Sequence, residues 1–455
     1  MKKEATKKGV VKMGTGLPVF NPYAAGIDIG SRSHFVCVSQ DNVKEFPVFT
    51  TDLHEIAKHL LSHGKRTVAM ESTGFYWRPL LVLLQDYGFD VTLVNARHLK
   101  NVKGHKTDVV DSKWLQLLHS IGLLSNSFQP DVFTHQLRTY TRHRKSLLED
   151  ASKYITKMNK TLVLMNIQLK AVLRDITGAS GMRVIEAILD GERDANNLEK
   201  LVSIRCESER KDIVKALTGD WREEYLFELK DCYDLYHYYW GKIRNIDKEI
   251  ERLLAENSKN KQHEVSKSNY KRNKKKQHQK NDPKFNVEGY AYEMTGGVDL
   301  LQITGVGINT VLTMMTEVGF DMSKFKSAKH FASWLGFAPN RKITGGKLLS
   351  SKTRKKTNPL AKVIRDAANS AGNSKTQLGD FFRRLAYRKG RIVAITATAR
   401  KICVFIYNML TTKQPFCYEL SQEEKQKIKT RKIKNIVKSL KGHDISKYEL
   451  ELAWI

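Results

Sequence analysis

The sequence is poor in the residues that build disulfide frameworks and zinc modules. Its 455 residues include only five cysteines, and no two of them stand at a paired spacing. This scarcity argues against a zinc module or a disulfide-bonded fold, and it fits a protein of a reducing compartment. The five are Cys37, Cys206, Cys232, Cys403 and Cys417.

Long apolar runs are also lacking. No stretch approaches the roughly 20 apolar residues that a membrane span needs. Residues 1–20 are rich in lysine and have no apolar centre, so they do not resemble a signal peptide. We therefore expect a soluble intracellular protein with no membrane partner.

Acidic residues are scarce relative to basic ones. The chain has 48 Asp and Glu against 78 Lys and Arg, a formal net charge of +30. So large a surplus indicates a polyanionic partner, most simply nucleic acid. The alternative is a basic protein with no such partner, but the clustering of the charge favours nucleic acid.

The length of the chain predicts two to four domains. We expect an α/β domain first, then long coiled-coil helices, then a mostly α-helical domain. The expected boundaries are a basic extension over 1–23, the α/β domain over 24–125, the helical region over 130–256, a basic linker or insertion over 257–288, the second domain over 290–412 and a basic tail over 413–455. The second domain is expected to begin with a helix-hairpin-helix-like unit around Gly305 and Gly307, although an ordinary turn between helices is nearly as good a reading.

An acidic residue, Asp28, lies near the end of a predicted buried strand in the α/β domain. Residues 26–31, GIDIGS, lie in a short apolar run that ends at a glycine, which is typical of a central strand entering a tight turn. An Asp in such a run is expensive to bury unless it is paired or binds a cation. Asp28 is therefore a candidate metal ligand.

Three further acidic residues have comparable positions. Glu71 ends the apolar run 68–71, and Asp108 and Asp111 open a helical stretch, three residues apart and so on one helix face. Taken singly, each has an ordinary explanation, such as a helix-start acid favoured by the helix dipole. Together with Asp28 they predict a site for one or two divalent cations, which prefer oxygen ligands. The order of strands and helices resembles the ribonuclease-H-like fold.

Basic residues elsewhere could contact phosphates. In the first long helix, Arg138 and Arg142 line one face, where they either contact nucleic acid or form a solvated surface. The segment 257–288 is basic and almost free of apolar residues, so it cannot fold alone; it includes Lys274, Lys275 and Lys276. In the second domain, basic residues surround Thr344: Arg341, Lys342, Lys347, Lys352, Arg354 and Lys355.

These motifs resemble those of the IS110-type transposases. The N-terminal resemblance rests on GIDIGS at 26–31, ESTG at 71–74 and KTDVVD at 106–111, and the C-terminal one on 329–340 and ITGGK at 343–347. It implies a RuvC-like domain in which Asp28, Glu71, Asp108 and Asp111 bind Mg²⁺. It also implies DNA donor and target partners, a structured bridge RNA as guide, a dimer or tetramer, and a cytoplasmic, nucleoid-associated protein of a prokaryotic cell.

The family uses a serine nucleophile immediately before the glycine pair, and this sequence has Thr344 there. Threonine carries the same hydroxyl, but its methyl group hinders approach. Either Thr344 attacks DNA, or Ser350 or Ser351 substitutes, or this copy is impaired; a hydroxyl that merely serves the glycine-rich turn is a fourth reading. The leading function is a DNA recombinase with a composite site. The alternatives are a RuvC-like structure-selective nuclease and an inactive nucleic-acid-binding scaffold.

Overall fold

The computed structural model divides the chain into two compact units, Met1–Gln129 and Pro130–Ile455. The residues that it describes are 11–12, 18–72, 74–95, 107–260, 265–267, 270–271, 279–354, 357–416, 426, 429–430, 433 and 436–437.

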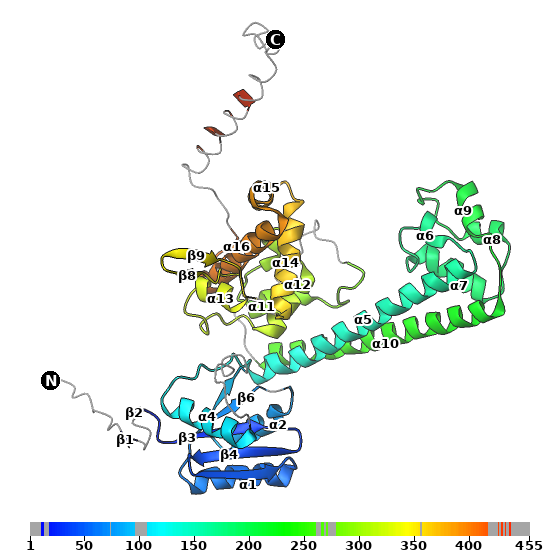
Figure 1. Ribbon diagram of the computed structural model, residues 1–455. Helices are drawn as coiled ribbons and strands as arrows, with labels where there is room; N and C mark the ends of the chain where they lie inside the picture. The colour runs from blue at the N-terminus through cyan, green and yellow to red at the C-terminus, as the bar shows by residue number, and fades with distance from the viewer. Residues whose placement is uncertain are drawn as a thin grey trace. The chain divides into compact units, whose positions relative to one another are not determined.

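The first unit is built on a five-stranded mixed sheet in the order β5-β4-β3-β6-β7 (Figure 1). The central strand pairs antiparallel with β4 and parallel with β6. The strands are β3 (Ala24–Ile29), β4 (Ser33–Ser39), β5 (Asn42–Pro47), β6 (Thr67–Glu71) and β7 (Asp90–Val94), beside a small pair, β1 (Val11–Lys12) and β2 (Pro18–Val19). The helices are α1 (Thr50–Ser62), α2 (Trp77–Asp86) and α4 (Asp108–Ser120).

Helices cover both faces of this sheet. Ile27 and Ile29 of β3 belong to the apolar core that α1 and α2 form on one face. On the other face, Ala69 of β6 and Val94 of β7 pack with Leu115 of α4. Because side chains alternate along a strand, these contacts fix which face every strand residue occupies. The predicted α/β class is confirmed.

The backbone of α4 lies directly against β3 at Gly26. A Cβ atom there would stand 2.3 Å from the Gln116 nitrogen and 2.4 Å from the Ser112 oxygen. Farther along, the Gln116 side chain donates to the Ala24 carbonyl, and the Phe20 amide donates to the Ser120 carbonyl. Later residues of α4 thus contact earlier residues of β3 and of the segment before it. The two elements therefore run antiparallel, and the first turn of α4 lies at the C-terminal end of β3.

The second unit contains two long antiparallel helices, α5 and α10, which lie side by side (Figure 1). Tyr154 stacks on Tyr239, with ring centroids 5.6 Å apart. The helices of this region are α5 (Val132–Leu164), α6 (Leu169–Val172), α7 (Ala179–Leu189), α8 (Ala195–Lys200), α9 (Arg210–Ala216) and α10 (Glu223–Asn260). The expected long helical middle is confirmed.

A buried ion pair interrupts the apolar contact between α5 and α10. Arg144 Nε donates to Asp247 Oδ1 at 2.5 Å, and both side chains are less than a tenth exposed. Arg144 Nη2 also donates to the Asn281 carbonyl at 3.0 Å. Removing one partner would leave the other charge buried and uncompensated, so the loss of either side chain should destabilise the contact between the two helices.

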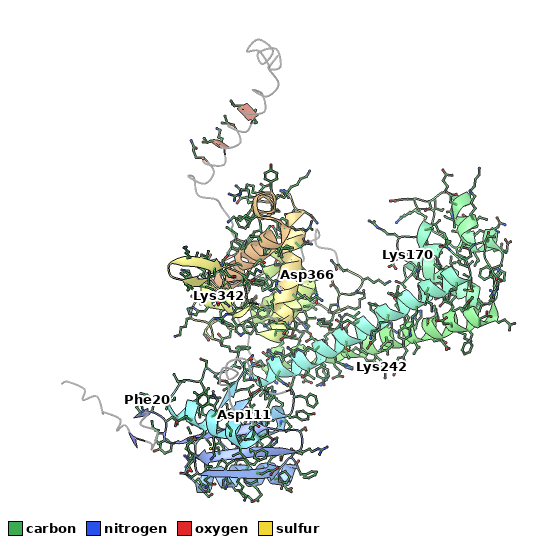
Figure 2. The ribbon with its side chains drawn as sticks, in the orientation of Figure 1. Phe20, Asp111, Lys170, Lys242, Lys342 and Asp366 are labelled. Carbon is green, nitrogen blue, oxygen red and sulfur yellow. The ribbon has the colours of Figure 1, made fainter. Side chains whose placement is uncertain are left out.

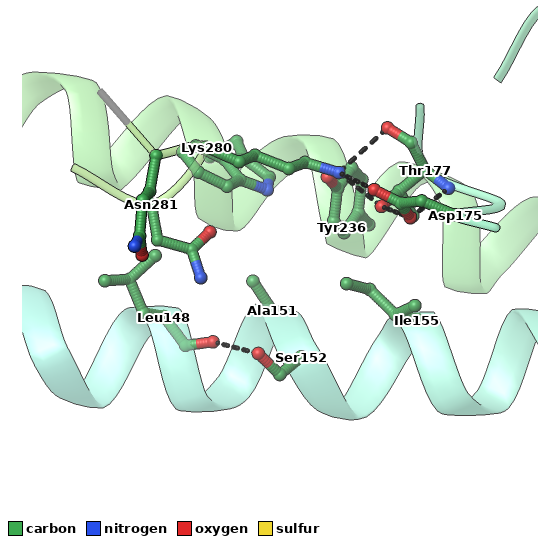
Figure 3. A pocket seen from close by; sticks show the side chains of 11 residues that line it. Leu148, Ala151, Ser152, Ile155, Asp175, Thr177, Tyr236, Lys280 and Asn281 are labelled. Carbon is green, nitrogen blue, oxygen red and sulfur yellow. Dashed lines mark hydrogen bonds and ion pairs between the residues drawn. The ribbon is translucent and has the colours of Figure 1, made fainter. Parts of the chain in front are cut away.

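Part of the basic segment predicted over 257–288 packs back onto these helices. Lys280 donates to the Thr177 carbonyl at 2.8 Å and pairs with Asp175 at 3.2 Å (Figure 3). Beside these contacts is a pocket of about 360 Å³, lined also by Tyr236 and Trp240. Residues 279–281 are therefore a structural strap, whereas Lys274, Lys275 and Lys276 lie outside the described residues.

The remainder of the second unit is a helical bundle with one small hairpin. Its elements are α11 (Val287–Met294), η2 (Leu300–Gln302), α12 (Ile308–Glu317), α13 (Ala328–Trp334), β8 (Lys342–Thr344), β9 (Lys347–Ser350), α14 (Pro359–Gly372), α15 (Gln377–Lys389) and α16 (Arg391–Thr412). The predicted mostly α-helical C-terminal region is confirmed.

Within the described residues, α16 is the one helix long and apolar enough to cross a membrane by length and composition. The expectation that no stretch meets this criterion is therefore wrong. However, α16 packs against α13, α14 and α15, and it buries Ala394, Thr398, Ile402 and Ile406. These contacts are those of a core helix.

The fit at Gly26 predicts a large effect of a single methyl group. We expect Gly26→Ala to lower the free energy of unfolding by about 2 kcal/mol or more, because two backbone atoms of α4 occupy the position of the new Cβ. Thermal unfolding and hydrogen exchange of α4 would measure the loss. Gly241→Ala is the control: its nearest contact is Arg244 Nη2 at 3.8 Å, and it should be neutral or slightly stabilising. Equal stability of Gly26→Ala and the parent would contradict the packing.

Candidate active site

Two of the predicted carboxylates lie at the ends of neighbouring parallel strands. Ile27 of β3 is paired with Met70 of β6, so Asp28 and Glu71 are the next residues along the two strands. Asp28 follows Gly26 by two positions, and Glu71 follows Ala69 by two. Alternation therefore directs both carboxylates to the face that α4 covers.

The other two belong to the first turn of α4. Asp108 and Asp111 begin this helix, and Figure 2 labels Asp111 there. Thr107 caps it, with its hydroxyl accepting from the Val110 amide at 3.3 Å. Because negative charge is favoured at a helix N-terminus, this turn tolerates two acids. The antiparallel run of α4 against β3 brings the turn to the end where Asp28 lies.

The four carboxylates act on one another. Partial burial, and after it the negative charges of Asp108, Asp111 and Glu71, together raise the pKa of Asp28 to about 6. The backbone amide of Ile29 donates to Asp28 and lowers the pKa in part. All four predicted metal ligands therefore lie within electrostatic reach at one edge of the sheet.

The donor set suits a hard divalent cation, because it consists of carboxylate oxygens whose mutual repulsion a cation relieves. Among the described residues, however, no three His, Cys, Asp or Glu side chains are close enough to hold one ion together. Binding would thus have to draw the carboxylates inward.

The second unit carries the predicted nucleophile on an exposed hairpin. Thr344 ends β8 and is paired with Lys347 of β9 across Gly345 and Gly346. Both glycines have positive φ, 54° and 76°, as a two-residue type I′ turn requires. The turn thus holds the Thr344 side chain in solvent, at the tip of the hairpin.

The hydroxyls considered as substitutes differ from Thr344. Ser350 ends β9, and its hydroxyl accepts from the Lys352 amide at 3.3 Å, so it serves the local backbone. Ser351 follows the strand and is exposed. Thr344 remains the predicted nucleophile.

Most of the cations predicted around Thr344 are exposed, and Figure 2 labels one of them, Lys342. The exposed ones are Arg341, Lys342, Lys347, Lys352 and Arg354, whereas Lys355 lies outside the described residues. Their charge is accessible from solvent, and contact with a phosphate stays a prediction.

Comparison with protein families gives two matches in chain order. Residues 25–167, which include the four carboxylates, match a transposase family whose model is named for the DEDD transposase of IS110. Residues 299–382, which include Thr344, match the transposase IS116/IS110/IS902 family. The chain belongs to the IS110 family of transposases. Among curated proteins, no match was found.

Membership confirms the resemblance seen in the sequence, and it makes this transposase a DNA recombinase that acts on DNA. The DEDD domain also indicates dependence on a divalent metal.

Two arginines predicted to contact nucleic acid have partners within the transposase. Arg142 donates to both carboxylate oxygens of Glu317, at 2.9 and 2.8 Å. Arg138 donates to the Glu317 carbonyl at 2.6 Å and is largely buried. These bonds hold α5 against the end of α12. Contact with nucleic acid stays a prediction for both, and it would compete with this structural role.

Two glycines have packing roles that the sequence signalled only weakly. The isolated Gly26 in an apolar strand is a known sign of close backbone approach. In the predicted helix-hairpin-helix, a Cβ on Gly305 would stand 2.1 Å from the Ala367 carbonyl oxygen of α14. The absence of a side chain at Gly305 therefore lets α14 pack directly against this turn. At Gly307 a Cβ would meet nothing within 4 Å.

The raised pKa of Asp28 predicts how stability depends on pH. The folded chain binds more protons than the unfolded chain between about pH 4 and pH 6, so stability falls as the pH rises through this window and stays reduced above it. In metal-free buffer we expect Asp28→Asn to stabilise the transposase by about 1 to 2 kcal/mol near pH 7.5, after allowing for its partial exposure. Near pH 4 the gain should vanish.

Urea unfolding with a chelator present would measure this difference. Asp41→Asn, at an exposed turn of the same unit, is the matched control and should change little. If Asp28→Asn were no more stable than the parent at either pH, the Asp28 carboxylate would be neither buried at a cost nor repelled by its acidic neighbours.

Proposed function

We propose that this transposase cuts and rejoins DNA with the hydroxyl of Thr344 and with Mg²⁺ held by Asp28, Glu71, Asp108 and Asp111. The observation that carries the proposal is the convergence of the four carboxylates, expressed in the raised pKa of Asp28. Asp28, Glu71 and Asp111 are partly buried and Asp108 is exposed, so their mutual repulsion costs stability that a divalent cation would restore.

The threonine acts as a nucleophile in this scheme. Its Oγ bonds to phosphorus, and the bond from phosphorus to one deoxyribose oxygen breaks. The hydroxyl proton is lost and the departing oxygen takes one up, so the charge is unchanged. Lys342, Lys347 and Arg341 neutralise the phosphate as negative charge builds on its oxygens. Attack by the DNA hydroxyl on the threonine ester then rejoins a strand.

The acidic quartet acts through charge. Near neutral pH the Asp28 carboxylate is mostly ionised, since its pKa is about 6. Asp108 and Asp111 are held by the capped first turn of α4, and Glu71 by the end of β6. Mg²⁺, when bound there, would supply Lewis-acid stabilisation of a phosphate oxygen.

The partners follow from the family and the charge. We infer that a structured guide RNA selects donor and target DNA, that the chain works as a dimer or tetramer, and that it acts at the nucleoid. The net charge of +30 supports binding of more than one nucleic acid, because each bound strand adds phosphates to be neutralised.

A trapped covalent adduct would test the nucleophile. On nicked suicide DNA that bears the ends of the element, we expect the parent protein to form an adduct that survives denaturation. Thr344→Ala should abolish it, and Thr344→Ser should retain or increase it, because serine lacks the hindering methyl group. Gel shift under denaturing conditions gives the yield.

Ser351→Ala, a neighbouring exposed hydroxyl, is the matched control and should leave the adduct intact. An undiminished adduct in Thr344→Ala would remove Thr344 from its role. Strand cleavage that needs Asp28 and Mg²⁺ without any adduct would favour the structure-selective nuclease.

Sequencing of the nucleic acid that co-purifies with the transposase would test the guide RNA. We expect one structured RNA species, encoded near the gene, in excess over bulk cellular RNA. Its removal by ribonuclease should abolish recombination while Mg²⁺ binding persists. Recombination that continues without RNA would contradict the guide.

A further inference from the structure

The hairpin that carries Thr344 also exposes an apolar surface. Ile343 is 60% exposed, Leu348 58% and Leu349 68%. Ile343 and Leu348 are cross-strand partners, so their side chains share one face of the ribbon. Three large aliphatic side chains in solvent on seven residues are costly unless something covers them. We call the pair Ile343 and Leu348 the apolar face of the hairpin; Leu349 is exposed next to it in the chain.

The fold holds the hairpin rigidly at its base. Pro339 bridges to Thr353, and the Asn340 amide donates to the Lys352 carbonyl at 3.2 Å. Phe337, just before the ribbon, is buried in the bundle. The register shifts between Lys342 and Ile343, a bulge that leaves Leu349 unpaired. Bulges of this kind re-aim side chains beside functional sites.

Charge selects the kind of partner. Residues 340–354 contain five cations and no acid. A second copy of the same hairpin would bring five like charges against five, which disfavours a symmetric contact. A DNA duplex provides phosphates for the cations, and between them apolar base and sugar surfaces. DNA therefore complements both parts of the hairpin.

We propose that the apolar face of the hairpin is a wedge that enters DNA and unstacks base pairs beside the phosphate attacked by Thr344. Thr344 and Lys347 form the next cross-strand pair, so they lie on the opposite face of the ribbon. In a groove, one face meets base pairs while the other meets the backbone. Aliphatic wedges of Leu and Ile kink DNA in this way. The inference rests on the proposed function and adds a positioning role to the same hairpin.

The test uses DNA distortion in place of chemistry. Full-length transposase, purified with its retained nucleic acid, is bound to a linear duplex that carries 2-aminopurine at dispersed positions. We expect the parent to raise 2-aminopurine fluorescence, and Ile343→Ser/Leu348→Ser to lose most of this rise. Its Kd should change by no more than about threefold, because phosphate contacts supply most of the affinity.

The control is Ile392→Ser on α16, the same polarity change at a side chain that is 82% exposed in the same unit. It should distort DNA like the parent. Circular dichroism should show that all variants fold, since exposed substitutions cost little stability. An unchanged fluorescence rise in Ile343→Ser/Leu348→Ser would overturn the wedge. So would loss of self-association in that variant with distortion intact, because the face would then bind a second copy.

Failure of the wedge and failure of the proposed function are distinguishable. Thr344→Ala should distort DNA like the parent although it forms no adduct. If the parent forms an adduct and the apolar face proves irrelevant to distortion, only the wedge fails. If distortion depends on the apolar face but no adduct forms, the wedge stands and Thr344 fails.

Discussion

The acidic site of this transposase depends on the contact between two backbones, those of β3 and α4. At Gly26 there is no side chain, so α4 approaches within the space that a methyl group would fill. This close contact sets the direction of α4 and its distance from the sheet. Asp108 and Asp111 come within electrostatic reach of Asp28 only because their helix runs antiparallel to β3 at this short distance.

That contact creates an electrostatic cost. Four carboxylates gather at one edge of the sheet, and burial and repulsion together raise the pKa of Asp28 to about 6. The first turn of α4 and the Ile29 amide offset only part of the repulsion. Natural sequences rarely keep such a local conflict except at functional sites, where a bound ligand can relieve it. The cost is therefore itself a sign of what the edge binds.

The basic side chains that give the net charge of +30 are of two kinds, those with partners inside the fold and those exposed to solvent. Arg144 is sealed between α5 and α10 with Asp247, and Arg142 is joined to Glu317 by two hydrogen bonds. These guanidinium groups hold the second unit together. On the hairpin, by contrast, Lys342 and Lys347 are exposed beside Thr344. A surplus of charge predicts a polyanionic partner, but only the contacts of each side chain show which cations are available to it.

The sequence by itself determined the order of strands and helices in the first unit, the place of each acid on them, and the family. Period-two alternation, glycine turns and motif spacing all act within a few residues, so they are readable in one dimension. The tertiary structure alone decided how α4 lies on β3, which arginines are buried, and that the hairpin leaves Ile343 and Leu348 in solvent. These features join distant residues, such as Arg144 and Asp247, 103 positions apart, whose contact depends on packing of the whole unit.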